Sequence, residues 1–439
     1  MKAKIALALL LAGGVAGCGV LGGGDDETTP TIGNRTPILG RENVTEVDPA
    51  LAGIAVVLPA EQPNAEWPQP GGNAAKAVGH VALPASLSRA WTAKIAGESN
   101  RVRLAAAPVV ANGMVYALDT EARAWAFDAT SGRTVWSQDL SVDGDGQSSV
   151  FGGGISADAT RVYAVTGVGD VFGLDARSGA QQWKVRPAGP MRGAPTVSGG
   201  SIYAMTQDNQ LYALAANSGA TLWNEAGAPG QTSIFGVAAP SAAQGTIIAG
   251  YSTGELSAYR YENGRNLWTD ALARTSISTS VSTLTDIDAD PVIERGRVYA
   301  VGQGGRMASY DLVSGQRIWE INIAGISTPL VAGEWIFVMT DEGKLLAIAR
   351  PSGRIRWMAQ LPAYRDMEDK EGPISWVGPV LAGNRLIVAS TEGELWSVSP
   401  GEGAANLMMK LDGRVSLSPV VANNMLYVLT DDGTIHAFR

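Results

Sequence analysis

Short runs of alternating apolar and polar residues fill most of the chain, and turn residues separate the runs. Between 195 and 224 four runs cover 195–197, 201–205, 210–214 and 221–224, divided by Gly-Gly, Asp-Asn and Asn-Ser-Gly. Alternation over a few residues, bounded by such turns, indicates β-strands. This stretch therefore predicts four short antiparallel strands in succession.

The same unit recurs along the chain and ends in the motif Ala-x-Asp-x-x-(Ser/Thr)-Gly-x-x-x-Trp. The best copy is Ala126 to Trp136, in which Gly132 can adopt the positive φ that a tight turn needs. A hairpin cannot cover its own tryptophan, whereas stacked hairpins can, so a role in repeat packing is predicted for each of them. These structural positions are Trp91, Trp136, Trp183, Trp223, Trp268, Trp319 and Trp357, and a weak copy runs from Ser397 to Leu407.

A proline marks the start of most units at a fixed distance from the motif. It stands 28 positions before the tryptophan at Pro108, Pro195, Pro240, Pro291 and Pro329. Constant spacing indicates one rigid unit, and proline, which lacks an N–H, belongs on an edge strand. The first strand of each unit is therefore expected to line a central channel.

The number of units gives the fold class. After Leu407 only three strands remain, near Pro419, Met425–Thr430 and Thr434–Phe438, and the missing fourth strand is found at 88–92, around Trp91. We therefore predict an all-β, eight-bladed β-propeller of four-stranded antiparallel blades over residues 86–439. The N-terminal strand completes the last blade and closes the ring.

The first 85 residues do not follow this pattern. Residues 1–17 have two lysines and a short apolar run, as in a signal peptide, and Val15-Ala16-Gly17-Cys18 resembles the lipobox of bacterial lipoproteins. Cys18 is therefore the expected lipidation site, the alternative being an ordinary secretory signal. Residues 18–85 are expected to form a flexible tether, in which Trp67 and the apolar segment 51–58 could pack on the ring.

Composition excludes several functions. The net charge is −9, and −11 once the two lysines of residues 1–17 are removed, so nucleic acid is not an expected partner. The single cysteine and the two histidines offer no thiolate nucleophile and no zinc cluster, and neither a metal nor a cofactor is expected. Two acidic clusters stand out, 143–146 and 286–290. For the second, a solvated loop, a calcium site and a partner-binding patch are the alternatives.

The tryptophan motif resembles that of the quinoprotein alcohol dehydrogenases, which are eight-bladed propellers. That resemblance implies a quinone cofactor beside a vicinal cysteine pair and a calcium ion, but this chain has no such pair. An enzyme is therefore not expected.

The lipobox, the propeller and the segment Leu284-Thr285-Asp286-Ile287-Asp288 together resemble the BamB family, lipoprotein subunits of the outer-membrane β-barrel assembly machinery. This resemblance implies that Leu284, Asp286 and Asp288 contact BamA. A second contacting loop of the family maps to Thr232, Ile234 and Phe235, where the family pattern has Leu, Leu and Arg. Both loops precede a first strand in consecutive blades, so we expect them to form one exposed apolar and acidic patch.

The resulting hypothesis is a non-catalytic scaffold, anchored by lipid to the outer membrane and facing the periplasm. It would bind BamA and the rest of the β-barrel assembly complex, with unfolded β-barrel substrates as further partners, and aid barrel insertion. The alternative is a quinoprotein-like envelope lipoprotein that binds polysaccharide or another periplasmic partner.

Overall fold

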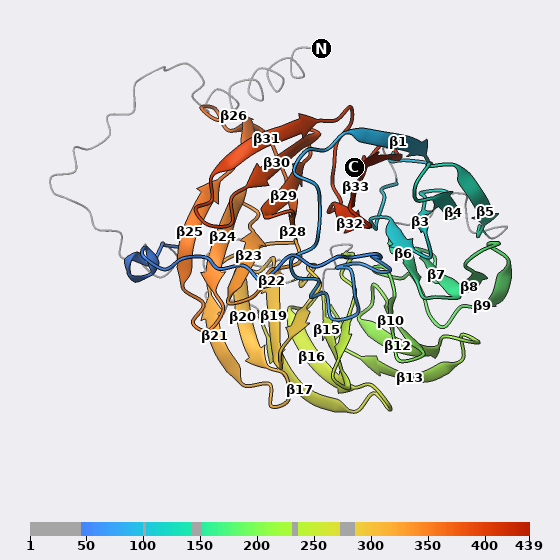
Figure 1. Cartoon of the computed structure of the whole chain (residues 1–439). Coiled ribbons are helices and arrows are strands. Elements are labelled where there is room, and N and C mark those ends of the chain that lie inside the picture. Colours follow the sequence, from blue (N-terminus) through green and yellow to red (C-terminus); the bar gives the residue numbers. More distant parts are fainter. Residues whose placement is uncertain (1–44, 100–101, 142–151, 231–235, 273–285) are drawn as a thin grey trace, which may run out of the picture. The chain divides into compact units, whose positions relative to one another are not determined.

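The computed structural model of this chain describes residues 45–99, 102–141, 152–230, 236–272 and 286–439 (Figure 1). They belong to one compact unit that begins at Thr45. Its regular structure is almost entirely β, because a single turn of 3₁₀ helix, η1 (Pro49–Leu51), is the only helix among the described residues.

The strands form eight four-stranded antiparallel sheets, the blades of a propeller (Figure 1). Blade 1 consists of β2 (Val109–Ala111), β3 (Met114–Leu118), β4 (Arg123–Asp128) and β5 (Thr134–Asp139). Blade 2 consists of β6 (Gly153–Ala157), β7 (Arg161–Thr166), β8 (Val171–Asp175) and β9 (Gln181–Val185). Blades 3 and 4 consist of β10 (Thr196–Ser198), β11 (Ser201–Met205), β12 (Gln210–Ala215), β13 (Thr221–Ala226); and β14 (Ser241–Ala243), β15 (Thr246–Gly250), β16 (Glu255–Arg260), β17 (Asn266–Ala271). Blades 5 and 6 consist of β18 (Val292–Glu294), β19 (Arg297–Gly302), β20 (Arg306–Asp311), β21 (Arg317–Ile321); and β22 (Leu330–Ala332), β23 (Trp335–Met339), β24 (Lys344–Ala349), β25 (Ile355–Gln360). Blade 7 consists of β28 (Trp376–Ala382), β29 (Arg385–Ser390), β30 (Glu394–Val398) and β31 (Ala405–Lys410). Blade 8 consists of β32 (Val420–Ala422), β33 (Met425–Leu429), β34 (Thr434–Phe438) and the N-terminal strand β1 (Arg89–Lys94). A small hairpin, β26 (Tyr364–Asp366) and β27 (Glu371–Pro373), lies between blades 6 and 7.

Ring closure takes place in blade 8, as the sequence predicts. β1 pairs with β34, with Trp91 opposite Ala437, so that the blade has the order β1-β34-β33-β32. Backbone hydrogen bonds between Ser88 and Arg439, 2.8 and 2.9 Å long, extend the pairing to the last residue. The two distant parts of the chain thus share one sheet and leave no open blade.

Each motif tryptophan packs on the next blade rather than on its own hairpin alone. Its indole N–H donates to a backbone carbonyl of the following blade at 2.9–3.2 Å. The motif glycine of that blade lies under the ring. A Cβ on Gly264, for example, would be only 2.7 Å from Trp223, and Gly264 has a φ of +71°. The motif therefore encodes contacts between blades, as predicted.

The small first residue of the motif also has a physical reason. Ala126 lies directly opposite Trp136, and a Cβ on Gly173, which lies opposite Trp183, would be 2.2 Å from that indole. A β-bulge follows each of these pairs, and the fourth strand continues two or three residues beyond the tryptophan, farther than the motif suggests.

The assignment of Leu407 as a weak copy of the tryptophan is wrong. Its side chain is 53% exposed, and it pairs with Trp396 instead of Ser397, one position away from the motif register. The cause is the closing blade. There the third and fourth strands are the two ends of the chain, so no Ser-Gly turn exists on which a tryptophan could dock.

Residues 45–88, called the N-terminal belt below, pack first on the outer strand β25, where Val47 pairs with Ile355, and then on the inner strands, so the compact unit begins at Thr45. Trp67 is buried and pairs with Val110 of β2. Other main-chain bonds join the belt to the ends of inner strands at Ala157, Ala242, Ile293 and Leu381. The belt therefore covers one end of the central channel, where the first strands finish (Figure 1).

Candidate partner-binding face and central funnel

Connections between consecutive blades converge at the other end of the channel, where the first strands begin. The β13–β14 connection carries Val237 and Ala239, whose N–H groups donate to Asp288 (2.5 Å) and Asp290 (2.7 Å) of the β17–β18 connection. The two segments that the sequence places side by side therefore contact each other directly.

Arg192, from the β9–β10 connection, is the central cation of this cluster. Its side chain is fully buried; Nη2 donates to the Asp286 carboxylate and to the Ile287 carbonyl (2.9 Å), and it lies 3.8 Å from Asp288 Oδ1. Among the described residues, Nε and Nη1 have no hydrogen-bond partner. Loss of one member of such a buried pair costs about 3–5 kcal/mol, since the other charge stays uncompensated.

Two glycines allow this close approach of the connections. A Cβ on Gly236 would lie 2.5 Å from Arg192 Nη2 and 2.7 Å from Asp288 Oδ1. A Cβ on Gly193 would lie 1.9 Å from the carbonyl oxygen of Val237. A larger residue at Gly236 would therefore clash with both charged groups, and one at Gly193 would clash with the backbone of the β13–β14 connection.

The expectation that Asp286 is exposed is wrong. Its side chain is 3% exposed because it forms the ion pair with Arg192, so it supports the cluster from inside. Asp288 is 13% exposed at the side chain, and burial raises its pKa to about 6 although Arg192 opposes the shift. The other residues of the candidate BamA contact, namely Leu284, Thr232, Ile234 and Phe235, lie outside the described residues, as do Cys18 and the acidic cluster 143–146.

The calcium alternative for residues 286–290 finds no support in the geometry. Asp286 is paired with Arg192, whereas Asp290 lies 3.9 Å from Lys76, so the two carboxylates have different cationic neighbours. Among the described residues, His, Cys, Asp and Glu side chains form no group of three that could hold a metal ion.

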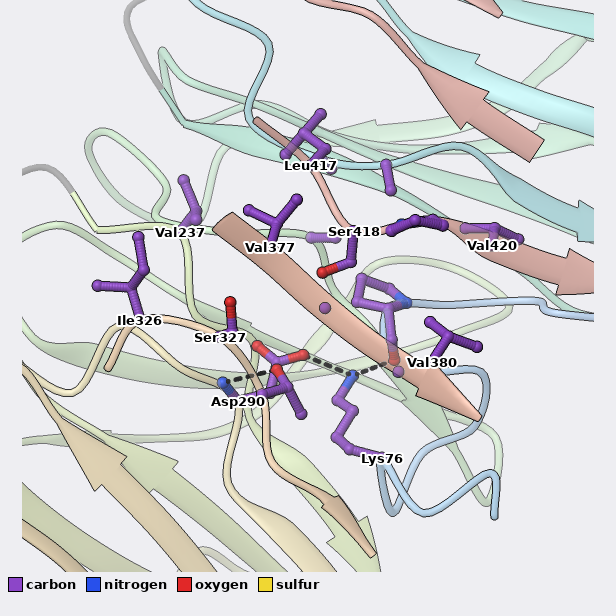
Figure 2. Close-up of a pocket in the computed structure, with 18 of the residues that line it drawn as sticks. Lys76, Val237, Asp290, Ile326, Ser327, Val377, Val380, Leu417, Ser418 and Val420 are labelled. Atoms are coloured by element: carbon purple, nitrogen blue, oxygen red, sulfur yellow. Dashed lines mark hydrogen bonds and ion pairs between the residues drawn. The ribbon is translucent and has the colours of Figure 1, made fainter. Parts of the chain in front are cut away.

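The channel forms a funnel of about 210 Å³ whose floor is the N-terminal belt. Its wall is built from segments that lead into the first strands around the ring, including Ala106, Val237, Ile326 and Leu417. Figure 2 shows Lys76 and Asp290 linked at the floor, with apolar side chains around them.

Lys76 fixes the belt at the floor of the funnel. Its ammonium group is buried, donates to the Pro70 carbonyl (3.0 Å) and to Thr196 Oγ1 (3.1 Å), and faces Asp290. Burial lowers the pKa of Lys76 and raises that of Asp290, while the attraction between the two charges opposes both shifts.

Sequence reasoning missed both buried cations. Lys76 had one available signal, since it is the only lysine or arginine between Arg41 and Arg89, within an apolar segment. Arg192 had none, because its carboxylate partners are 94 and 96 positions away and only the ring brings them together.

The geometry first defines a class of protein, the eight-bladed β-propellers in which a tryptophan of one blade docks on the next. The solved structure of BamB from Moraxella catarrhalis matches with a TM-score of 0.65 at 20% identity and covers 81% of this chain and 100% of that one. Quinohemoprotein alcohol dehydrogenase from Comamonas testosteroni matches with a TM-score of 0.64 at 13% identity, over 85% of this chain and 80% of that one. At these identities the likeness shows the fold alone.

Sequence comparison is more specific. The profile of the family described as outer membrane protein assembly factor BamB matches residues 85–146, 125–359 and 364–439. The BamB of Salmonella typhimurium is 31% identical over 335 residues, which is 75% of this chain and 83% of that protein. The BamB of Yersinia pestis is 27% identical over 329 residues, covering 74% and 81%. The chain belongs to the BamB family of outer membrane protein assembly factors.

The quinone cofactor that the dehydrogenase resemblance implies does not fit this chain. A vicinal disulfide is impossible with one cysteine. The funnel is also smaller than the roughly 300–1,000 Å³ typical of small-molecule sites, and the belt residues Trp67 and Lys76 occupy its floor.

Proposed function

We propose that this protein is a non-catalytic scaffold of the outer-membrane β-barrel assembly machinery and that it binds BamA. The observation that carries the proposal is the family membership, combined with the contact between the β13–β14 and β17–β18 connections. Arg192 supports that contact from below, so the two connections would meet a partner as one preformed surface.

The contact is tested by changing the apolar part of this surface. Ile234→Asp is expected to weaken binding of purified BamA periplasmic domains by at least tenfold, because it introduces a charge into an apolar anchor. The matched control is Val313→Asp. Val313 is 81% exposed in the turn between the third and fourth strands of blade 5, which antiparallel order places at the opposite end of the blade. Equal affinity of the two variants, measured by surface plasmon resonance, would refute this choice of face.

Attachment through lipid on Cys18 is the second part of the proposal. No helix in the described part of the chain has the length and apolar character needed to cross a membrane. Acyl chains on Cys18 would supply the membrane affinity. Cys18→Ser is therefore expected to move the protein from the outer-membrane fraction to the periplasmic fraction. Retention of the variant in the membrane after a high-salt wash would contradict the lipid anchor.

Binding of unfolded β-barrel substrates stays a prediction from the resemblance. Substrate binding can be distinguished from BamA binding by crosslinking the protein to a denatured barrel protein in the absence of BamA. Crosslinks of the isolated protein would support direct substrate binding, and their absence would leave the scaffold role standing alone.

A further inference from the structure

The central funnel is a second candidate site beside the two connections that the proposed function uses, and it shares Val237 and Asp288 with them. The belt residues Trp67, Pro70 and Lys76 line one end of the funnel, and residues of the connections between blades line the other. Its volume of about 210 Å³ is below the range of small-molecule and cofactor sites. A space of this size suits one long side chain.

The upper wall of the funnel is apolar and partly open to solvent. Ile326 is 41% exposed there, and Val237, Val377 and Leu417 line the same cavity (Figure 2). Apolar walls of this kind favour an occupant with an aliphatic stem. They do not favour a strongly hydrated ion that would have to lose its water.

The lower part of the funnel carries a net negative charge. Lys76 contributes one positive charge and Asp288 and Asp290 two negative charges, so the charged lining residues sum to −1. The nearby Arg192 is shared, because its Nη2 contacts the Asp286 carboxylate and also lies 3.8 Å from Asp288 Oδ1. Lys76 and Arg192 therefore face three carboxylates, namely Asp286, Asp288 and Asp290, and Asp288 has only the longer of the two contacts with Arg192.

We propose that the funnel receives the lysine or arginine side chain of a partner polypeptide, with the stem against the apolar wall and the cationic head at Asp288. A charge-assisted hydrogen bond in a partly desolvated site is stronger than the same contact on an open surface. This proposal rests on the proposed function, because Asp288 belongs to the β17–β18 connection, and it adds the funnel as the place where a basic side chain of the partner enters. A failure of the peptide experiment below would leave the contact tested by Ile234→Asp standing.

The titration of Asp288 gives the proposal a pH dependence. Burial raises the pKa of Asp288 to about 6, and the groups around it are Arg192, Lys76, the N–H groups of residues 237 and 238, and the carboxylates of Asp286 and Asp290. A bound cation favours the charged carboxylate, so affinity is expected to fall as the pH decreases from 7.5 to 5.

The probe is the peptide acetyl-Ser-Gly-Arg-Gly-Ser-amide, titrated into the whole protein and followed by saturation-transfer NMR. Its counterpart contains citrulline, which has the shape of arginine without the charge. We expect millimolar binding of the arginine peptide, with the strongest transfer to its side-chain methylenes, and at least tenfold weaker binding of the citrulline peptide. Equal binding of both peptides, or no binding of either, would overturn the proposal.

Variants locate the site. Asp288→Asn is expected to lower the affinity for the arginine peptide at least tenfold at pH 7.5. Asp412→Asn removes the same charge from an exposed residue of the β31–β32 connection that does not line the funnel, and should change nothing. Equal losses in the two variants would indicate non-specific attraction and refute the site. Ser418→Phe, from an exposed position in the lining, fills the funnel without a change of charge and should also abolish binding. Urea unfolding confirms that each variant is folded.

Discussion

The docking of each tryptophan on the next blade is tested best at Trp223, for which the chain provides an internal control. The indole of Trp223 is 8% exposed, lies 5.9 Å from the ring of Tyr203 and 6.5 Å from that of Tyr259, and donates to the Tyr261 carbonyl at 2.9 Å. Trp223→Ala therefore removes a buried aromatic group and leaves a cavity between blades 3 and 4.

The expected cost follows from these contacts. Truncation of a buried Phe or Trp to Ala costs about 3–5 kcal/mol, and the lost hydrogen bond accounts for about 0.5–1.5 kcal/mol of the effect. Trp223→Phe keeps most of the ring area but has no N–H, so its cost should be about 1–2 kcal/mol. Leu407→Ala, at the corresponding position in the sequence but outside the motif register, should change the stability by less than about 0.5 kcal/mol, because Leu407 is exposed.

The assay is urea unfolding followed by far-UV circular dichroism, in which each variant is compared with its own folded and unfolded baselines. The change in the free energy of unfolding is the product of the m-value and the shift of the midpoint, provided that the m-value stays constant. Equal midpoint shifts for Trp223→Ala and Leu407→Ala would show that docking between blades is not what the motif supplies.

Three further predictions concern the buried charges and the ring closure. Arg192→Met should destabilise the fold by about 3–5 kcal/mol, and adding Asp286→Leu should restore most of it, as measured by urea unfolding; a second loss of the same size would contradict a coupled pair. Because the pKa of Asp288 is higher in the folded state than in the unfolded chain, the folded state binds more protons between about pH 4 and 6, so its stability should fall as the pH rises through that window. Asp288→Asn should flatten that part of the pH profile of the urea midpoint, and an unchanged slope would refute the assignment. A chain that starts at residue 45 keeps every described contact and should unfold at the wild-type midpoint, whereas a chain that starts at residue 95 lacks β1 and should be less stable and aggregate, as measured by size-exclusion chromatography.

The repeat made most of the fold predictable from the sequence. The strands expected at 201–205 and 210–214 are β11 and β12 within one residue, because alternation and turn residues are local signals. Closure by Trp91 followed from the number of strands alone. Leu407 was misjudged because the next blade is the closing one. Its third and fourth strands are not joined by a turn, so no docking place exists there for a tryptophan.

The site was less accessible to sequence reasoning, because burial is a property of the assembled ring. Asp286 lies in an alternating acidic and apolar segment, which in the sequence resembles an exposed loop. Its burial follows from the ion pair with Arg192, which only the folded ring forms. The belt has no periodicity, since it crosses different strands once each, so its packing left no pattern in the sequence. Lys76 is buried for the same reason.

The place where the belt first meets the propeller determines how the protein bears mechanical load. Val47 pairs with Ile355 in β25, the outermost strand of blade 6, and Asp48 forms an ion pair with Arg354. A pull transmitted from the N-terminus therefore reaches blade 6 and then the bonds of the belt in series before it reaches β1. Under such a pull the contacts of the belt would break before the pairing of β1 with β34, so the propeller would stay closed.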